Sequence, residues 1–227
     1  YGAIIACTIL SGKALLPFVQ FAQLLSRLNQ IVSGYKSLDS LMKQPTEHPK
    51  GTEFMRRDRY EGEIKFDNVS YSYPNQDSDA IENISFKIGK GERIGLVGRV
   101  GSGKTTVGKL ITKLFLPQKG SISIDGIDIR QLDPSEIREN IGYVAQEPWL
   151  IAGTIEQNIS LGATDIKSEE IIEAANISTA TEFINKHTKG FKQVLDERGE
   201  GLSGGQKQAL TVARALAQRP PIFIFDE

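Results

Sequence analysis

The segment from Gly98 to Thr105, GRVGSGKT, fits the pattern G-x-x-x-x-G-K-[ST]. It follows the apolar run RIGLV at 93–97, which predicts a short buried strand, and precedes TVGKLITKLF, whose spacing predicts a helix. Between a strand and a helix this pattern is typical of a phosphate-binding loop, because its glycines let backbone N–H groups point at phosphate oxygens and the helix dipole attracts anions. The plainer alternative is a glycine-rich turn with an exposed lysine. The loop therefore favours an α/β fold.

Two side chains of this loop would bind a nucleotide and its metal ion directly. Lys104 would bring a full positive charge to the β and γ phosphates of a nucleotide, and Thr105 would ligate Mg²⁺. Kinases, GTPases, helicases and transporters all use such a loop, so the loop alone does not identify the reaction.

From Glu63 onwards, the pattern alternates between strands and helices. Strands are predicted at 64–73, 80–88, 141–145 and 221–225, with a hairpin around Asp125-Gly126. Helices are expected to open at Asp133-Pro134-Ser135-Glu136, to cover 168–190 with Ser168 as N-cap, and to run from about Ser203 to Gln218. This order predicts an α/β core with a helical insert between the strands at 141–145 and 221–225.

The N-terminal part has a different character. Residues 1–12 are almost wholly apolar but too few to cross a bilayer, which takes about 20 residues, so they are a core helix or a membrane span without its first turns. After Pro17 the apolar residues keep a helical spacing, and no flank of a cleavable signal peptide is present. We therefore expect the end of a membrane helix with its cytoplasmic extension at 1–43, a linker at 44–62, and a second domain at 63–227. Because the sequence starts at Tyr1 and stops after an apolar run, we also expect both ends to be truncated.

Composition narrows the class of protein. With 227 residues and 39% hydrophobic residues, the chain has enough apolar side chains for a core. Its formal charge of −1 gives no general case for a nucleic-acid partner. The single cysteine, Cys7, cannot form an internal disulfide and suits a reducing compartment.

A second motif selects among the proteins that share the loop. Residues Leu202 to Gln206 read LSGGQ, and here the chain resembles the ATP-binding cassette (ABC) family, whose signature sequence this is. Ser203 and the glycines at a helix start would form an anion-binding N-terminus for a γ-phosphate held by a second cassette. A simple capping box is the alternative for Ser203 and Gln206. The resemblance covers residues 63–227 and implies a P-loop NTPase cassette with an antiparallel β subdomain.

The resemblance also implies a role for each matching residue, with ATP and Mg²⁺ as the cofactors. Tyr73 would stack on adenine, Gln146 would touch Mg²⁺ or water, Asp226 would hold the Mg²⁺ shell, and Glu227 would polarise the attacking water. The implied catalytic residues are Glu227, Gln146 and Lys104, and the implied metal-site residues are Thr105, Gln146 and Asp226. The implied nucleotide contacts are Tyr73, Gly98, Gly101, Ser102, Gly103, Lys104, Thr105, Thr106, Ser203, Gly204, Gly205 and Gln206.

Wider stretches look like the type I secretion branch of ABC exporters, which export proteins from Gram-negative bacteria. They include the N-terminal helix, RQLDPSEIRENIGYVAQ, and DERGEGLSGGQKQAL, in which Asp196 departs from the usual GERG. The resemblance implies a bacterial inner-membrane protein with its cassette in the cytoplasm. The implied partners are a second cassette, most simply as a homodimer, the protein's own transmembrane domain, membrane-fusion and outer-membrane secretion proteins, and the exported substrate, but no nucleic acid.

Other functions stay open at this point. Peptide and lipid exporters share many of these sequence motifs. A degenerate cassette would hold ATP without hydrolysing it. A soluble chromosome-type ATPase would carry a long coiled coil, and no heptad pattern is seen in this sequence. The family also needs an aspartate loop and a histidine after the last strand, and His48 and His187 lie too early. We therefore expect the chain by itself to be a nucleotide-binding remnant with little or no hydrolysis.

Overall fold

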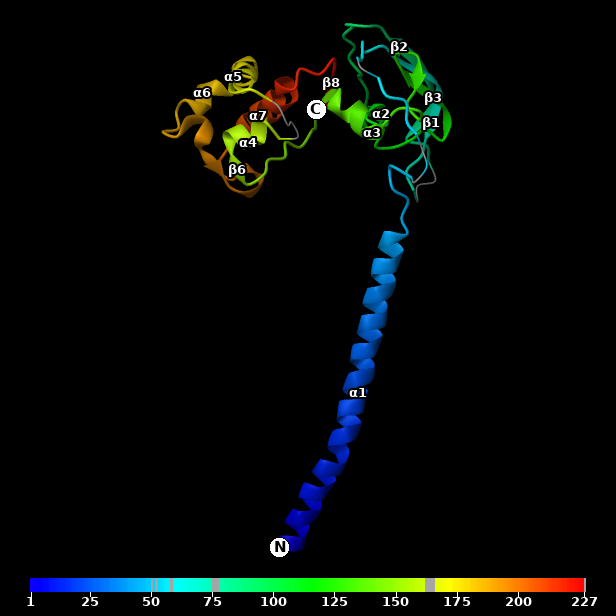
Figure 1. The fold of residues 1–227 in the computed structure, drawn as a ribbon, viewed down its shortest axis with the longest axis vertical. Coiled ribbons are helices and arrows are strands. Elements are labelled where there is room, and N and C mark those ends of the chain that lie inside the picture. The colour runs from blue at the N-terminus through cyan, green and yellow to red at the C-terminus, as the bar shows by residue number, and fades with distance from the viewer. Residues whose placement is uncertain (50, 52, 58, 75–77, 162–165, 227) are drawn as a thin grey trace. The chain divides into compact units, whose positions relative to one another are not determined.

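The computed structural model describes residues 1–49, 51, 53–57, 59–74, 78–161 and 166–226. The chain divides into two compact units, Tyr1–Thr52 and Glu53–Glu227 (Figure 1). Each unit is described by itself.

The first unit is one long helix, α1 (Gly2–Met42), which continues through Pro17 and buries none of its residues. This single helix includes both the apolar segment at 1–12 and the helical segment after Pro17 that the sequence predicts. Within the described residues it is the one helix long and apolar enough to cross a membrane, with a mean hydropathy of 1.8 in its best window. The hydroxyls of Thr8 and Ser11 donate to the carbonyls of Ile4 and Cys7, so these polar groups are satisfied inside the helix.

The second unit contains the predicted antiparallel β subdomain. Strand β1 (Ile64–Tyr71) pairs with β2 (Ile81–Ile88) on one side and β3 (Lys119–Ile124) on the other, and β3 continues into β4 (Ile127–Asp128). Asp125 and Gly126, at φ values of 49° and 83°, make the predicted hairpin turn between β3 and β4. Phe66, Ile122 and Ile124 are almost fully buried on the inner face of this sheet.

A strap of residues 53–57 and 59–63 crosses the β subdomain, so the second unit begins at Glu53, before the predicted boundary at Glu63. The backbone N–H of Met55 donates to Gln131 O at 2.8 Å. The buried Lys113 ammonium lies 4.6 Å from the centre of the Phe54 ring and donates to Leu132 O at 2.6 Å. This half of the predicted linker is therefore bound to the domain, because its apolar and backbone groups find partners there.

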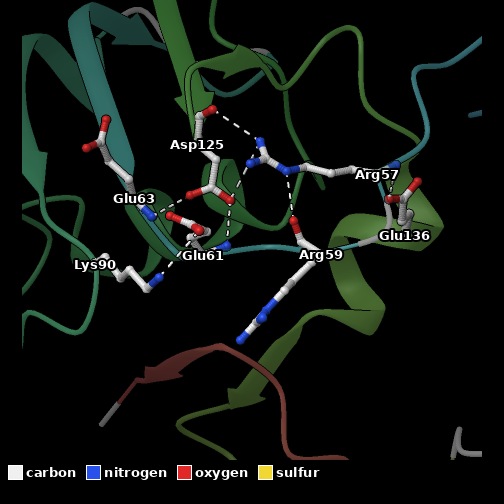
Figure 2. Close-up of polar contacts among 7 residues, drawn as sticks. All are labelled: Arg57, Arg59, Glu61, Glu63, Lys90, Asp125 and Glu136. Atoms are coloured by element: carbon white, nitrogen blue, oxygen red, sulfur yellow. Dashed lines mark hydrogen bonds and ion pairs between the residues drawn. The ribbon is translucent and has the colours of Figure 1, made fainter.

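Asp125 is the main anchor of the strap (Figure 2). Its carboxylate accepts the backbone N–H groups of Glu61 and Glu63, each at 2.8 Å. Arg57 lies 3.8 Å from the same carboxylate, which is only 4% exposed, and donates to the Asp125 carbonyl at 3.2 Å. The Arg57 N–H also donates to Glu136 at 2.9 Å. A buried charge is thus compensated by two N–H donors and one cation.

Four short elements, two helices and two strands, form the part of the second unit around the phosphate-binding loop. Helix α2 (Lys104–Ile111) begins at the loop, and α3 (Pro134–Glu139) begins at the predicted cap Asp133, which accepts from Ser135 N at 2.7 Å. Strand β5 (Ile141–Val144) pairs in parallel with β8 (Ile222–Phe225). The predicted strands at 141–145 and 221–225 are confirmed.

The predicted buried strand at 93–97 is wrong in this structure. Residues 92–99 have no regular structure, and Ile94, Leu96 and Val97 are 44%, 47% and 99% exposed. A strand forms only where a neighbour pairs with its backbone, and none of the described strands pairs with this segment, because β5 and β8 form a two-stranded ladder of their own. The phosphate-binding loop therefore starts from an irregular, exposed segment.

The predicted helical insert follows β5 and precedes β8 in the chain. Its core is formed by buried residues of the helices, among them Ile155, Ile159, Ala175, Ile184 and Leu210. The elements are β6 (Gly153–Thr154), α4 (Ile155–Ile159), α5 (Ser168–Ile177), α6 (Thr181–Ile184), a 3₁₀ turn (Gly190–Lys192), β7 (Val194–Leu195), a second 3₁₀ turn (Glu197–Gly199) and α7 (Gly204–Ala217). The helices α4, α5, α6 and α7 lie together in Figure 1.

The insert differs from the sequence prediction in one helix. Residues 168–190 are not one helix, because the chain turns between α5 and α6 at Thr179, which has a φ of 63°. The N-cap of α5 is Lys167 rather than Ser168, and its backbone N–H donates to Glu170 at 3.1 Å. Helix α7 agrees with the prediction, with Ser203 as N-cap and Gln218 as C-cap.

Candidate nucleotide-binding site

The loop from Gly98 to Thr105 adopts a conformation that depends on its glycines. Gly101 and Gly103 have φ values of 82° and 85°, which side chains disfavour. A Cβ at Gly103 would lie 2.5 Å from Ala80 O, and one at Gly98 would lie 2.5 Å from the Ser102 hydroxyl. Gly103 is also the N-cap of α2, so the loop leads directly to a helix N-terminus that favours an anion.

Lys104 folds back over this loop. Its ammonium donates to Gly98 O at 3.0 Å and to Arg99 O at 3.1 Å. These are exposed bonds to neutral carbonyls, whereas a phosphate oxygen offers a charge-assisted bond that is about twice as strong. The arrangement places a cation inside the loop with acceptors that an incoming phosphate can replace.

Asp226 joins the loop to the end of the chain's last strand. Thr105 Oγ1 donates to Asp226 Oδ1 at 3.1 Å, across 121 residues of sequence. The Asp226 N–H donates to Val144 O at 2.9 Å, which extends the β5–β8 ladder and fixes the carboxylate above α2. The structure thus brings together Lys104, Thr105 and Asp226.

The chemistry of this pair fits Mg²⁺. A hydroxyl and a carboxylate oxygen lie side by side at the helix N-terminus, and Mg²⁺ is held in proteins by one or two such oxygens together with phosphate and water. Among the described residues no group of three or more His, Cys, Asp or Glu forms a metal site. A metal bound with a nucleotide is the arrangement that these donors suit.

Sequence reasoning missed Tyr143, which belongs to this site. The Tyr143 hydroxyl donates to Asp226 Oδ2 at 3.0 Å. Burial of the phenol, and then its hydrogen bond to the Asp226 carboxylate, raise the pKa of Tyr143 to about 12, so the hydroxyl keeps its proton at neutral pH. Only the pairing of β5 with β8 reveals this contact, since 83 residues separate the two side chains in sequence.

Tyr73 lies beside the loop but is engaged with protein. Its hydroxyl shares a hydrogen bond of 3.0 Å with Thr106, and its ring makes edge contacts with Tyr71 and Phe115 at centroid distances of 5.2 and 5.4 Å. Tyr73 is partly buried against the core of the β subdomain. Its predicted stacking on adenine stays a prediction.

The LSGGQ residues begin α7 in the helical insert. Ser203 Oγ accepts from Gln206 N at 3.3 Å, and Gln206 accepts in return from Ser203 N at 2.9 Å, which makes a complete capping box. A Cβ at Gly204 or Gly205 would meet nothing within 4 Å, so these glycines leave an open surface at the helix N-terminus. None of the described contacts joins this surface to the loop of the same chain.

The two remaining predicted residues are not tied to the site by described contacts. Gln146 lies exposed in the bend after β5. Glu227 lies outside the described residues. Sequence reasoning also missed Arg214, which binds the chain that follows Gln146. Arg214 of α7 donates to Trp149 O at 3.0 Å and to Asn158 O at 2.7 Å, and burial lowers its pKa.

Comparison with known proteins agrees with this geometry. The family described as "ABC transporter" matches residues 81–227. The leukotoxin translocation ATP-binding protein LktB of Mannheimia glucosida is 37% identical over 226 residues, which is 100% of this chain and 32% of that protein. The alpha-hemolysin translocation ATP-binding protein HlyB of Escherichia coli O157:H7 is likewise 37% identical, with the same shares covered.

A solved structure shows the same fold. The bacterial Atm1-family ABC exporter with ATP bound is 31% identical and has a TM-score of 0.78, with 87% of this chain and 35% of that chain covered. This chain spans about a third of the length of the curated relatives that it matches. Since the family match covers more than half of the chain, from β2 to its end, this chain belongs to the ABC transporter family.

Proposed function

We propose that this chain binds ATP at the loop from Gly98 to Thr105 and is the ATPase part of an exporter. The hydrogen bond between Thr105 and Asp226 is the observation that carries this proposal. It joins a hydroxyl and a carboxylate at the N-terminus of α2, where Lys104 is the neighbouring residue, and phosphoryl transfer depends mainly on positioning and charge neutralisation of this kind.

Each residue has a part in this scheme. Backbone N–H groups of the loop bind the phosphates, and Lys104 exchanges its carbonyl partners for β- and γ-phosphate oxygens. Thr105 and Asp226 hold Mg²⁺, with Gln146 near it, and Glu227 orients the attacking water. When bound, Mg²⁺ neutralises charge on the phosphates. Tyr73 packs against the adenine.

The open N-terminus of α7 is proposed to serve a second cassette. Ser203, Gly204, Gly205 and Gln206 contact the γ-phosphate bound to the loop of a partner copy, so that two chains close around two nucleotides. The open space where a Cβ of Gly204 or Gly205 would lie supports this proposal, because it leaves the helix N-terminus accessible to a ligand.

The transported substrate is proposed to be a protein. The relatives named for leukotoxin and alpha-hemolysin translocation align with the whole chain, including the part that forms α1. We infer that α1 leads from the transmembrane domain in a bacterial inner membrane, with the cassette in the cytoplasm. Membrane-fusion and outer-membrane secretion proteins would then complete the export route.

Nucleotide binding tests the first part of the proposal. Calorimetric titration of the chain with ATP and Mg²⁺ should give saturable binding that Lys104→Ala weakens about 100-fold, because a charge-assisted bond is worth about 1.5–3 kcal/mol and two phosphates are contacted. Lys109→Ala, which removes a lysine from the same helix, should bind as well as the parent. Equal affinity of the Lys104→Ala chain would contradict the assignment of the loop.

Export tests the second part. In cells that produce the full-length transporter, Lys104→Ala should remove one or a few large proteins from the culture medium, as seen by comparing secreted proteins with those of unmodified cells. Unchanged secreted proteins with altered peptides or lipids would instead support the peptide or lipid exporter.

A further inference from the structure

Tyr143 and Asp226 share one face of the β5–β8 ladder. Tyr143 pairs with Ile224, and side chains two residues apart on a strand lie on the same face, so Asp226 follows on the side of Tyr143. That face packs against α2. The hydroxyls of Tyr143 and Thr105 therefore reach the same carboxylate from two different elements, one at each oxygen.

Gly108 makes room for the tyrosine ring. A Cβ at Gly108 would lie 3.2 Å from Tyr143 Cε2 and 3.5 Å from Ile224 Cγ2, closer than most real contacts for the ring carbon. Glycine inside a helix costs about 1 kcal/mol relative to alanine. Its presence in the buried face of α2 lets the ring lie against the helix and brings the hydroxyl to Asp226.

We propose that Tyr143 is a positioning residue for Mg²⁺, a role that rests on the nucleotide site proposed above. With both oxygens bound by hydroxyl donors, the Asp226 side chain cannot rotate freely, and the oxygen next to Thr105 stays directed towards the metal position. Groups that orient a ligating or water-binding carboxylate in this way typically change metal affinity by about 10- to 100-fold when they are removed.

Tyr143→Phe is the appropriate test, because it removes the hydroxyl and keeps the ring that fills the space beside Gly108. Mn²⁺, a paramagnetic substitute for Mg²⁺, would be titrated in the presence of a non-hydrolysable ATP analogue, with free Mn²⁺ measured by electron paramagnetic resonance. We expect Tyr143→Phe to weaken Mn²⁺ binding about 10-fold. Its affinity for the analogue in EDTA should equal that of the parent.

A matched control and a second background separate positioning from packing. Tyr60→Phe also removes a buried tyrosine hydroxyl, but in the β subdomain, and should leave both affinities unchanged. In an Asp226→Asn chain, Tyr143→Phe should have no further effect on Mn²⁺ binding, because the hydroxyl acts through the carboxylate.

The outcomes are distinct. Unchanged Mn²⁺ affinity in Tyr143→Phe, or an equal loss in the Asp226→Asn background, would overturn the role of Tyr143 while leaving the nucleotide site in place. Absence of metal-dependent binding of the analogue in the parent chain would overturn the proposed nucleotide site itself, and the role of Tyr143 with it.

Discussion

Two glycines of the phosphate-binding loop are needed for different reasons. Gly101 and Gly103 have almost the same positive φ, 82° and 85°. A Cβ at Gly101 would meet nothing within 4 Å, whereas one at Gly103 would lie 2.5 Å from Ala80 O. Gly101 therefore supplies conformation alone, and Gly103 also allows the loop to pack against the residue that precedes β2.

This difference predicts unequal effects of the same substitution. Gly101→Ala should lower the free energy of unfolding by about 1 kcal/mol, the cost of a left-handed alanine. Gly103→Ala should lower it by about 3 kcal/mol, since overpacking adds about 2 kcal/mol. Denaturant unfolding followed by circular dichroism measures both. Equal losses would show that the contact with Ala80 yields without cost.

Among the elements, the strap has a predictable dependence on Asp125. Asp125→Asn keeps the size of the side chain but removes one acceptor for the N–H groups of Glu61 and Glu63 and the charge facing Arg57. We expect a loss of about 2 kcal/mol in the free energy of unfolding and faster hydrogen exchange at those two amides. Asp67→Asn, at an exposed ion pair, should change stability by no more than about 0.5 kcal/mol.

Elements that are determined by a few adjacent residues were predicted correctly, whereas an element that needs a partner far away in the sequence was not. The Asp125-Gly126 turn, the Asp133 cap and the Ser203 cap each depend on two to four adjacent residues, and all three were predicted correctly. The segment at 93–97 was not, because its state depends on a neighbour that pairs with it. An apolar composition permits burial but does not provide the partner strand.

The same distinction applies to the candidate site. Residues in contiguous motifs, such as Lys104 and Thr105, could be proposed from the sequence alone. Tyr143 could not, because the register of β5 against β8 decides whether its hydroxyl meets Asp226. The strap contacts of Asp125 span more than 60 residues and were hidden in the same way.

At the scale of the whole molecule, buried phenols predict a loss of stability in alkali. Burial first, and then the nearby Glu136 carboxylate, raise the pKa of Tyr60 above its ordinary value of 10.0, and burial also raises those of Tyr71 and Tyr143. Above about pH 10 the unfolded chain therefore binds fewer protons than the folded chain, and the free energy of unfolding falls. Below that pH these phenols contribute no pH dependence.

Unfolding by urea at pH 8 to 11 tests this effect. The parent should lose stability above pH 10, and Tyr60→Phe should lose less, because the chain then has one fewer buried phenol to ionise. Tyr35→Phe, which changes an exposed tyrosine of α1, should follow the parent. A parallel decline of the Tyr60→Phe chain and the parent would show that other groups control alkaline unfolding.

The strap also determines where the second unit can be produced as a separate recombinant protein. Tyr60 is 4% exposed, and the Asp125 carboxylate is held by amides of the strap itself. A protein trimmed to start at Ile64 would leave a cavity the size of a tyrosine and a buried carboxylate without its donors. A protein that starts at Glu53 retains both, so the residues from Glu53 to Gly62 belong in any expression design, even though those of them that the structure describes contain no helix or strand.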